Sequence, residues 1–202
     1  MYYSGGKRMQ NNWQEKLQEE FPFMKQNPVE EEKNLYRHHG CECSGGWYDI
    51  LHDCCKKITE RYEEAGLPID FVPAQIKEKF GTLRFYYGYE DAPCGIAAFD
   101  NLGTGTSIRP VPGINGEDNE DKIKLRRDIA AIVCEAEEKS AHTCEMCGAE
   151  GSLKKVYPGR VDTFCDKCAA KTLERIEEKR KARRELSEQE YLEKYVKTVP
   201  LN

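Results

Sequence analysis

Four cysteines in two closely spaced pairs are the residues of this chain best suited to chemistry. The first pair lies in CEMCG at residues 144–148 and the second in CDKC at residues 165–168, which gives the spacing C-x2-C-x17-C-x2-C. Each C-x2-C turn can direct two sulfurs at one ion, and a tetrahedral Zn²⁺ ion is held by two such turns that face each other. The spacing therefore predicts a Zn²⁺ cofactor with four ligands: Cys144, Cys147, Cys165 and Cys168.

A redox or disulfide role is the alternative for paired cysteines. Disulfide frameworks are typical of small secreted domains, and the N-terminal residues MYYSGGKRMQNNWQ lack the apolar segment of a secretory signal. Thiols that stay inside the cell remain reduced, which favours metal binding over disulfide formation. Four sulfur ligands leave no position for a catalytic water, so the sequence predicts a structural metal.

A second, smaller group of possible metal ligands lies in the segment HHGCEC. Its members are His38, His39, Cys41 and Cys43. Their spacing fits no regular zinc finger, so the competing interpretation is a reduced cysteine packed near Trp47 beside an exposed histidine pair. A nucleophilic Cys43 with a histidine base is a further alternative, which adjacency in sequence does not establish.

The residues around the cysteine pairs predict the elements that position the thiols. The stretches LKKVY and RVDTF flank Pro158 and Gly159, which indicates a short hairpin that brings the two turns together. Cys168 lies where a helix-forming segment begins, and a helix N-terminus favours thiolate charge. A cysteine turn, a hairpin and a helix in this order predict a treble-clef-like zinc finger.

The preceding residues predict a small core of helices and strands. The stretch WYDILHDCCKKITERYEEAG, from Trp47 to Gly66, places apolar residues on one helical face and ends at a glycine. The stretch AQIKEKFGTLRFYYGY alternates polar and apolar residues and predicts two strands that turn at Gly81, although QIKEKFG also fits one helical turn. The stretch DKIKLRRDIAAIVCEAEEKS predicts a further helix.

The expected fold class is therefore α+β, with a helix-plus-β-hairpin core, a C-terminal treble-clef-like zinc finger and a helical tail. The expected segments are an N-terminal helical segment (1–36), the core (37–142), the finger (143–172) and the tail (173–202). Residues 91–120 are rich in Gly, Pro, Asn and Asp and show no periodicity, which predicts a flexible insertion in the core.

Basic and aromatic side chains indicate a possible binding surface. The candidates are Lys77, Lys79, Arg84 and Tyr86 on the hairpin, and Lys179 and Arg180 on the tail. On one face of a hairpin, cations can contact phosphates and an aromatic ring can stack on a base. Acidic residues surround the basic run of the tail, a mixture that is typical of a solvated helix. Nucleic-acid binding, and a nucleotide-binding or enzymatic site on the hairpin, are the alternatives that this surface leaves open.

Four segments together resemble a known family: CECSGGWYDIL, QIKEKFGTLRFYY, EEKSAHTCEMCGAEG and TFCDKC. In these segments the chain is similar to a widespread family of small phage and prophage proteins. Members combine a Gly-Trp helix, a KEKFG-LRFY segment and a C-terminal zinc knuckle in this order. The resemblance spans residues 37–170 and implies a phage setting, and therefore the cytoplasm of a bacterial host.

Charge and hydropathy narrow the classes of function. The net charge of −5 provides no global attraction to phosphate backbones. No apolar run approaches the length of about 18 residues that a membrane crossing needs. We expect a non-enzymatic accessory protein without membrane contact, which binds a host protein of the defence or transcription machinery.

Overall fold

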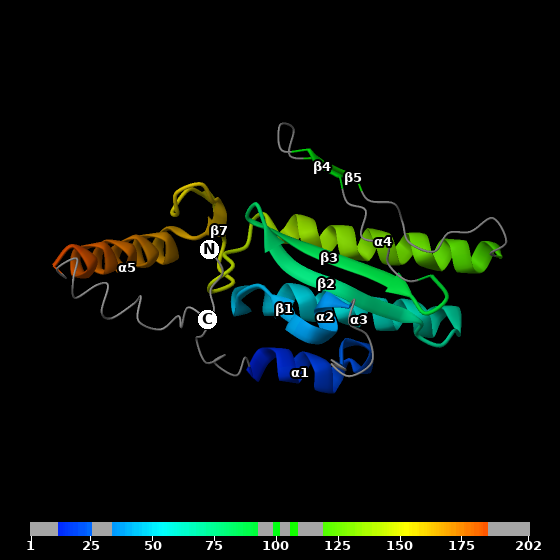
Figure 1. Ribbon diagram of the computed structural model, residues 1–202. Coiled ribbons are helices and arrows are strands. Elements are labelled where there is room, and N and C mark those ends of the chain that lie inside the picture. Colours follow the sequence, from blue (N-terminus) through cyan, green and yellow to red (C-terminus); the bar gives the residue numbers. More distant parts are fainter. Residues whose placement is uncertain (1–11, 26–33, 93–98, 102–105, 109–118, 186–202) are drawn as a thin grey trace, which may run out of the picture.

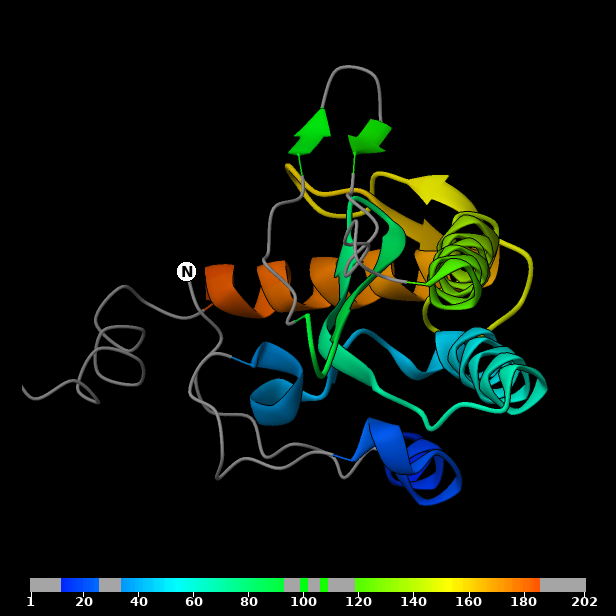
Figure 2. The ribbon, with the colours of Figure 1, turned by 90° about the vertical axis from the view of Figure 1, so that its right-hand side faces the viewer.

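A three-stranded sheet forms the centre of the molecule in the computed structural model, and two long helices lie on one of its faces (Figures 1 and 2). The structure describes residues 12–25, 34–92, 99–101, 106–108 and 119–185. The helices are α1 (Asn12–Glu20), α2 (Leu35–His39), α3 (Tyr48–Ala65), α4 (Glu120–Ser140) and α5 (Asp166–Glu185), with 3₁₀ helices η1 (Pro22–Met24) and η2 (Gly45–Trp47). The strands are β1 (Cys41–Glu42), β2 (Phe71–Lys79), β3 (Thr82–Tyr89), β4 (Phe99–Asn101), β5 (Thr106–Ile108), β6 (Ser152–Lys154) and β7 (Asp162–Phe164). This mixture of helices and small sheets confirms the expected α+β class.

The hairpin β2–β3 confirms the two predicted strands, and the alternative of a helical turn is wrong. The strands pair antiparallel, with Ile76 opposite Phe85, and β1 pairs parallel with the other edge of β2. Alternation of side chains places Ile76, Leu83 and Phe85 in the core. The two turn residues, Phe80 and Gly81, have φ of 54° and 77°, as a two-residue hairpin loop of the mirror-image type requires.

Helices α3 and α4 pack against each other and cover the same face of the sheet (Figure 2). The helix predicted from Trp47 is confirmed, and Gly66 ends it in a left-handed conformation. Helix α4 begins after Asn119, whose side chain accepts a hydrogen bond of 2.8 Å from the backbone N–H of Lys122. The buried side chains of α3 are Ile50, Leu51, Cys54, Cys55, Ile58 and Tyr62.

The described part of the first 36 residues joins this core. Leu17 on α1, Met24 on η1 and Tyr36 on α2 are buried in the same apolar cluster as the helices and the sheet. The Tyr36 hydroxyl donates to the Met24 carbonyl (2.6 Å), and the Asn34 side-chain amide donates to the Pro73 carbonyl on β2 (2.9 Å). These contacts attach α1, η1 and α2 to the central sheet.

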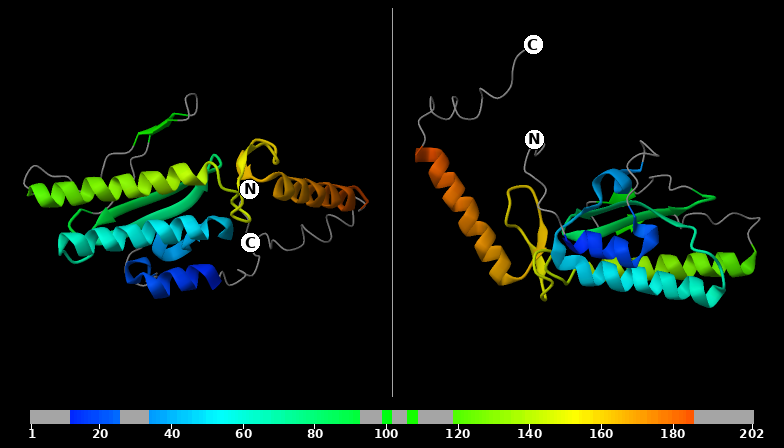
Figure 3. Two further views of the ribbon diagram at one scale, coloured as in Figure 1. Left: turned by 180° about the vertical axis from the view of Figure 1, so that it is seen from behind. Right: turned by 90° about the horizontal axis from the view of Figure 1, so that it is seen from below.

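The residues after α4 form a second, smaller cluster, which carries the predicted metal ligands. Strands β6 and β7 pair antiparallel, and the apolar cluster contains Cys144, Val156, Phe164 and Ala169. Helix α5 begins there and projects away from the sheet in all the views of Figures 1 and 3. Residues 186–202 of the expected tail lie outside the described residues.

The expected insertion at residues 91–120 is described only in part. Strands β4 and β5 within it pair antiparallel, which the sequence did not predict. Residues 93–98, 102–105 and 109–118 lie outside the described residues. Asp91, at the start of the segment, forms ion pairs of 2.5 Å with both Lys122 and Arg126 of α4. Asp91 therefore ties the start of the insertion to α4, the helix in which the insertion ends.

Candidate metal centre

The four predicted ligands lie together between the end of α4 and the start of α5. The sulfurs of Cys144, Cys147, Cys165 and Cys168 all lie within 4.8 Å of one another, and those of Cys147 and Cys165 are 3.7 Å apart. Among the residues that the structure describes, this is the group of Cys, His, Asp or Glu side chains close enough to share a metal ion. The predicted cysteines thus form a candidate metal site.

Backbone hydrogen bonds explain why the first two sulfurs face the same point. The Gly148 N–H donates to the Cys144 carbonyl (2.9 Å), and the Cys144 N–H donates to the Ala149 carbonyl (2.7 Å). Gly148 has a φ of 76°, a conformation that glycine adopts freely and that other residues adopt at a cost. These bonds close a tight turn that places Cys147 beside Cys144.

The second pair of ligands uses the start of α5. Cys165 directly precedes the helix, and Cys168 lies in its first turn. The Cys168 backbone N–H donates to the Cys165 sulfur at 3.4 Å. This hydrogen bond, followed by hydrogen bonds with the neighbouring thiols, lowers the pKa of the Cys165 thiol to about 7. An N–H without a partner inside the helix therefore favours the thiolate that a metal binds.

Charge repulsion limits how far the four thiols ionise on their own. Burial, followed by hydrogen bonds with the neighbouring thiols, raises the pKa of Cys168 to about 12. Four thiolates at this spacing repel one another, and a divalent cation between them would offset the repulsion. The donor set therefore fits a metal that accepts soft sulfur ligands.

The core loop that contains SGGW docks onto the first cysteine turn. The Gly46 N–H donates to the Glu145 carbonyl (2.8 Å), and the Ser44 N–H donates to the Glu145 carboxylate (3.0 Å). The Trp47 indole N–H donates to the Thr143 carbonyl (2.8 Å). This loop therefore forms hydrogen bonds with Thr143 and Glu145, the residues on either side of the ligand Cys144.

Gly46 approaches the cysteine turn too closely for any side chain. A Cβ at this position would lie 2.5 Å from the Cys144 carbonyl oxygen and 2.6 Å from the Cys147 nitrogen. Both are backbone atoms of ligand residues, so they cannot move without displacing the sulfurs. A glycine is therefore required where the metal turn meets the core.

The tip of the hairpin β2–β3 contacts the other side of the cysteine module. The Thr163 hydroxyl on β7 donates to the Gly81 carbonyl (2.6 Å), and the Glu145 N–H donates to the Thr163 carbonyl (2.9 Å). The Arg160 guanidinium forms an ion pair of 3.0 Å with Glu78 on β2. The module is thus bonded to the hairpin and to the SGGW loop, in addition to its chain connection.

The sequence predicts the ligands but not these docking contacts. By local pattern, the glycines before Trp47 mark the start of a helix, and Phe80 and Gly81 mark a hairpin turn. Neither pattern points to cysteines that lie far along the chain. The one hint in the sequence is the expected family resemblance, whose segments include the SGGW and KEKFG motifs together with the cysteine turn.

The structure does not form the second possible metal site. Within the described ranges, His38, His39, Cys41 and Cys43 do not appear as a shared ligand group. Cys41 is buried in the core cluster that also contains Trp47, and Cys43 packs against that cluster. Burial raises the pKa of both thiols well above the usual range, which disfavours metal binding and a nucleophilic role for Cys43. The competing interpretation of reduced, packed cysteines agrees with the structure.

The candidate binding face of the hairpin is formed only in part. Lys77 lies directly opposite Arg84 across the two strands, on the face that points away from Leu83 and Phe85. The Lys77 ammonium lies 5.4 Å from the centroid of the Tyr86 ring. Tyr86 is only 7% exposed, so the prediction that its ring is open to stack on a base is wrong.

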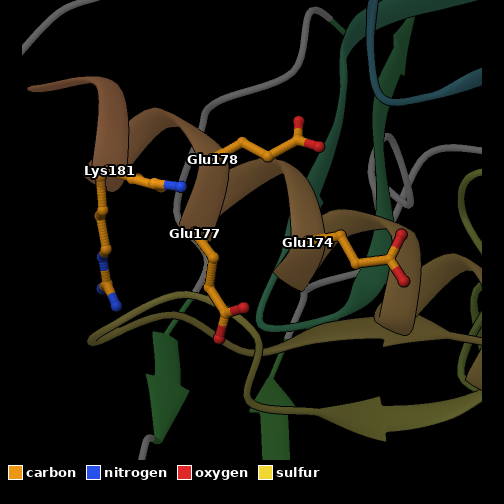
Figure 4. A pocket seen from close by; sticks show the side chains of 5 residues that line it. Glu174, Glu177, Glu178 and Lys181 are labelled. Carbon is orange, nitrogen blue, oxygen red and sulfur yellow. The ribbon is translucent and has the colours of Figure 1, made fainter.

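The basic residues of the tail lie on a different element. Lys179 and Arg180 are exposed on α5, which projects away from the hairpin (Figure 3). Figure 4 shows a surface depression on this helix, which is lined by Glu174, Glu177, Glu178, Arg180 and Lys181. All five residues belong to α5 and three are acidic, so the basic run forms a solvated surface of mixed charge.

Comparison with known proteins adds no relative. No protein-family model, curated protein or solved structure matches this chain. Among the helices that the structure describes, none combines the length and the apolar composition of a membrane-crossing segment. Function is therefore inferred from the site itself.

Proposed function

We propose that the metal is Zn²⁺ and that residues 143–172 form a treble-clef-like zinc finger. The support is the order of its parts, namely a cysteine turn, the hairpin β6–β7 and a helix whose start carries the last two ligands. Four sulfur donors suit a tetrahedral Zn²⁺ ion and leave no position for a water, so the ion stabilises structure. A binding free energy on the order of 10 kcal/mol would supply much of the stability of the finger.

Metal analysis tests the identity of the ion. Protein purified without added metal should contain about one zinc ion per chain. Cys165→Ser should lower the zinc content, whereas Cys134→Ser, at an exposed cysteine on α4, should leave it unchanged. Zinc near zero in a folded protein whose four thiols titrate freely would contradict the proposal.

We further propose a non-enzymatic accessory protein, encoded by a phage as the resemblance implies, whose finger binds a protein of the bacterial host. The observation that carries this proposal is the exposure of large apolar side chains on the finger and its helix. Met146 is 48% exposed, Leu153 is 57% exposed and Leu173 is 45% exposed. Exposed apolar groups concentrated in one small module are typical of a protein interaction site. The acidic balance of the chain also favours a protein partner over nucleic acid.

Affinity capture with paired variants tests protein binding. Tagged, zinc-loaded protein should retain a stoichiometric host protein from a bacterial lysate, with or without nuclease treatment. Leu153→Ser combined with Leu173→Ser should abolish retention, because the contact loses apolar area. Leu67→Ser is the matched control, since Leu67 is 42% exposed but follows α3 in the core. A partner that disappears after nuclease treatment would contradict protein binding.

Nucleic-acid binding is a second candidate function, favoured by two cations that face each other on the hairpin. Lys77 and Arg84 lie on the face of the hairpin that points away from the core, where their side chains could contact the phosphates of a strand. Lys79 lies on the same face, two residues along β2. Lys77→Ala combined with Arg84→Ala should weaken the binding of single-stranded DNA, most clearly at low salt. The absence of DNA binding by the wild-type chain would reject this candidate.

A further inference from the structure

The candidate metal centre is open to solvent on one side and closed on the other. Cys147 is exposed, whereas Cys144 is fully buried and belongs to the apolar cluster of the finger. Cys165 and Cys168 pack against that cluster and are partly exposed. A dissolved oxidant therefore reaches the sulfur of Cys147 more readily than that of Cys144.

A second thiol lies within reach of the exposed one. The Cys147 and Cys165 sulfurs are 3.7 Å apart, and a disulfide bond of about 2.05 Å needs them to approach by less than about 2 Å. Cys147 lies on the first cysteine turn and Cys165 on the second, so a bond between them would join the same two turns that a metal joins. Inside cells, where disulfides are usually transient, an accessible cysteine beside a second cysteine is typical of a thiol that senses oxidants.

The backbone of both residues is held in place by contacts within the chain. The Cys147 nitrogen lies against Gly46, where a Cβ would be 2.6 Å from it. The Cys165 carbonyl accepts from the Ala169 N–H (3.0 Å), and the Cys165 sulfur accepts from the Cys168 N–H (3.4 Å). These contacts keep the two sulfurs close to each other.

We propose that Cys147 is an oxidation site, and that a peroxide such as hydrogen peroxide joins it to Cys165 and releases the Zn²⁺ ion. This reaction rests on the zinc finger proposed above, whose metal it releases. The Cys147 thiolate attacks one peroxide oxygen, which breaks the O–O bond and gives a sulfenic acid and a hydroxide ion. The Cys165 thiolate then attacks the sulfenic sulfur and displaces a second hydroxide ion. The two sulfurs lose two electrons in total, and the peroxide gains them.

Oxidation should remove the metal without separating the finger from the core. Two ligands, Cys144 and Cys168, remain after the disulfide forms, and two thiolates hold Zn²⁺ far less well than four. The hydrogen bonds from the SGGW loop go to Thr143 and Glu145 and involve no sulfur. The disulfide also keeps the two cysteine turns together. The Gly46 N–H should therefore exchange as slowly in the oxidised, zinc-free protein as in the zinc-loaded one.

Treatment of the zinc-loaded full chain with hydrogen peroxide tests the site. A colorimetric chelator should detect more free zinc than in an untreated sample, with about one ion released per disulfide formed. Peptide mapping without reductant should identify the Cys147–Cys165 bond as the main product, and dithiothreitol with added zinc should restore the starting protein. Zinc that stays bound, a main product that joins other cysteines, or fast exchange at Gly46 after oxidation would overturn the proposal and leave the zinc finger standing.

Cys147→His separates oxidation from metal binding. Histidine is an ordinary ligand of Zn²⁺, so the variant should bind zinc but release it to peroxide about tenfold more slowly, because the accessible thiol is gone. Cys134→Ser removes an exposed cysteine outside the site and should release zinc as the wild type does. Equal release from Cys147→His and the wild type would overturn the proposal. If histidine does not bind zinc at this position, the peptide map of the wild type decides. A reduced wild type that holds no zinc would reject the zinc finger and this reaction together.

Discussion

At the scale of single residues, backbone atoms join the metal site to the core. Gly46 donates to the Glu145 carbonyl and faces backbone atoms of the ligand residues Cys144 and Cys147. Because these atoms belong to the turn that aims the sulfurs, the size of residue 46 is coupled to the geometry of the site. Gly46 thus constrains the geometry of the candidate metal site without being a ligand.

Gly46→Ala should therefore weaken metal binding and lower the free energy of unfolding by about 1–3 kcal/mol, since an added methyl group overpacks a closed contact. Urea unfolding and competition with a zinc chelator measure the two effects. Gly45→Ala is the matched control, because a Cβ at Gly45 would meet the side chain of Trp13 and no backbone atom of a ligand residue. Equal losses in both variants would argue against a special role for Gly46.

At the scale of elements, the hairpin β2–β3 contacts both α4 and the finger. The Leu83 N–H donates to the Ser140 hydroxyl (2.8 Å), and the Phe85 N–H donates to the Glu137 carboxylate (2.7 Å). Side chains of α4 thus satisfy the open edge of β3, which would otherwise invite pairing with another strand. The turn of the hairpin instead contacts the finger, where the Gly81 carbonyl accepts a hydrogen bond from the Thr163 hydroxyl.

Removal of the metal should reduce the local stability of the finger and the SGGW loop and leave the helices of the core unchanged. After chelation, we expect faster amide hydrogen exchange in the finger and at Ser44 and Gly46, whose N–H groups donate to Glu145. Ile58 and Ile129, in the buried contact of α3 and α4, should keep their protection. Equally faster exchange throughout would mean that the metal supports the whole fold. Unchanged exchange at Gly46 would mean that the contact between the SGGW loop and the cysteine turn persists without the metal.

A network of ion pairs joins α3 to α4 and makes their contact depend on pH. The Lys139 ammonium lies 3.0 Å from Asp53 and 2.8 Å from Glu135. Hydrogen bonds from Lys139 lower the pKa of both carboxyl groups. A carboxyl group with a lowered folded-state pKa contributes stability above its unfolded pKa of about 4, and loses it as the pH falls through the folded value.

Lys139→Met should cost about 0.5 kcal/mol of unfolding free energy at neutral pH, since these groups are half exposed. The difference from the wild type should shrink as the pH falls below about 4, where the carboxyl groups become protonated in both proteins. Urea unfolding curves of both proteins, recorded from neutral pH to below about pH 4, measure this difference in unfolding free energy. Lys124→Met, at an exposed lysine of α4, is the control. A difference that stays constant with pH would exclude the ion pairs as its cause.

At the scale of the whole molecule, the core is fastened at both ends. The finger contacts one end of the core. Arg126, in the first half of α4, lies towards the opposite end (Figure 1). Arg126 is 1% exposed, and its guanidinium lies 2.5 Å from Asp91, 3.6 Å from Asp70 and 4.3 Å from the centroid of the Tyr89 ring. The Tyr62 hydroxyl of α3 donates to Asp70 (2.5 Å). One buried cation thus joins α3, α4 and the end of β3.

Arg126→Met should lower the free energy of unfolding by about 1 kcal/mol, because the Asp70 and Asp91 carboxylates are partly exposed and Asp91 keeps its ion pair with Lys122. The zinc content should stay at the wild-type level, since the finger lies at the other end. Chemical denaturation measures the free energy of unfolding, and elemental analysis measures the zinc content. Arg127→Met, at the exposed neighbour, should change neither. Zinc loss in the folded Arg126 variant would show that the two ends are coupled.

The sequence by itself determined what depends on short-range spacing. The two C-x2-C turns predicted the ligands because each turn is closed by bonds between near neighbours, such as Gly148 to Cys144. The helix from Trp47 and the hairpin at Gly81 followed from periods of apolar residues, which mark one buried face in each element. The α+β class followed from these elements together.

Only the tertiary structure decided how the elements meet. It placed the SGGW loop on the cysteine turn and the hairpin tip on β7, and it buried Cys41 and the ring of Tyr86. The bond from Ser44 to Glu145 spans 101 positions of the chain, and no local period records a contact at that separation. Burial likewise depends on what packs against a residue from elsewhere in the chain. Contacts between distant residues are chosen by the packing of the whole core, so they become visible only when the chain is folded.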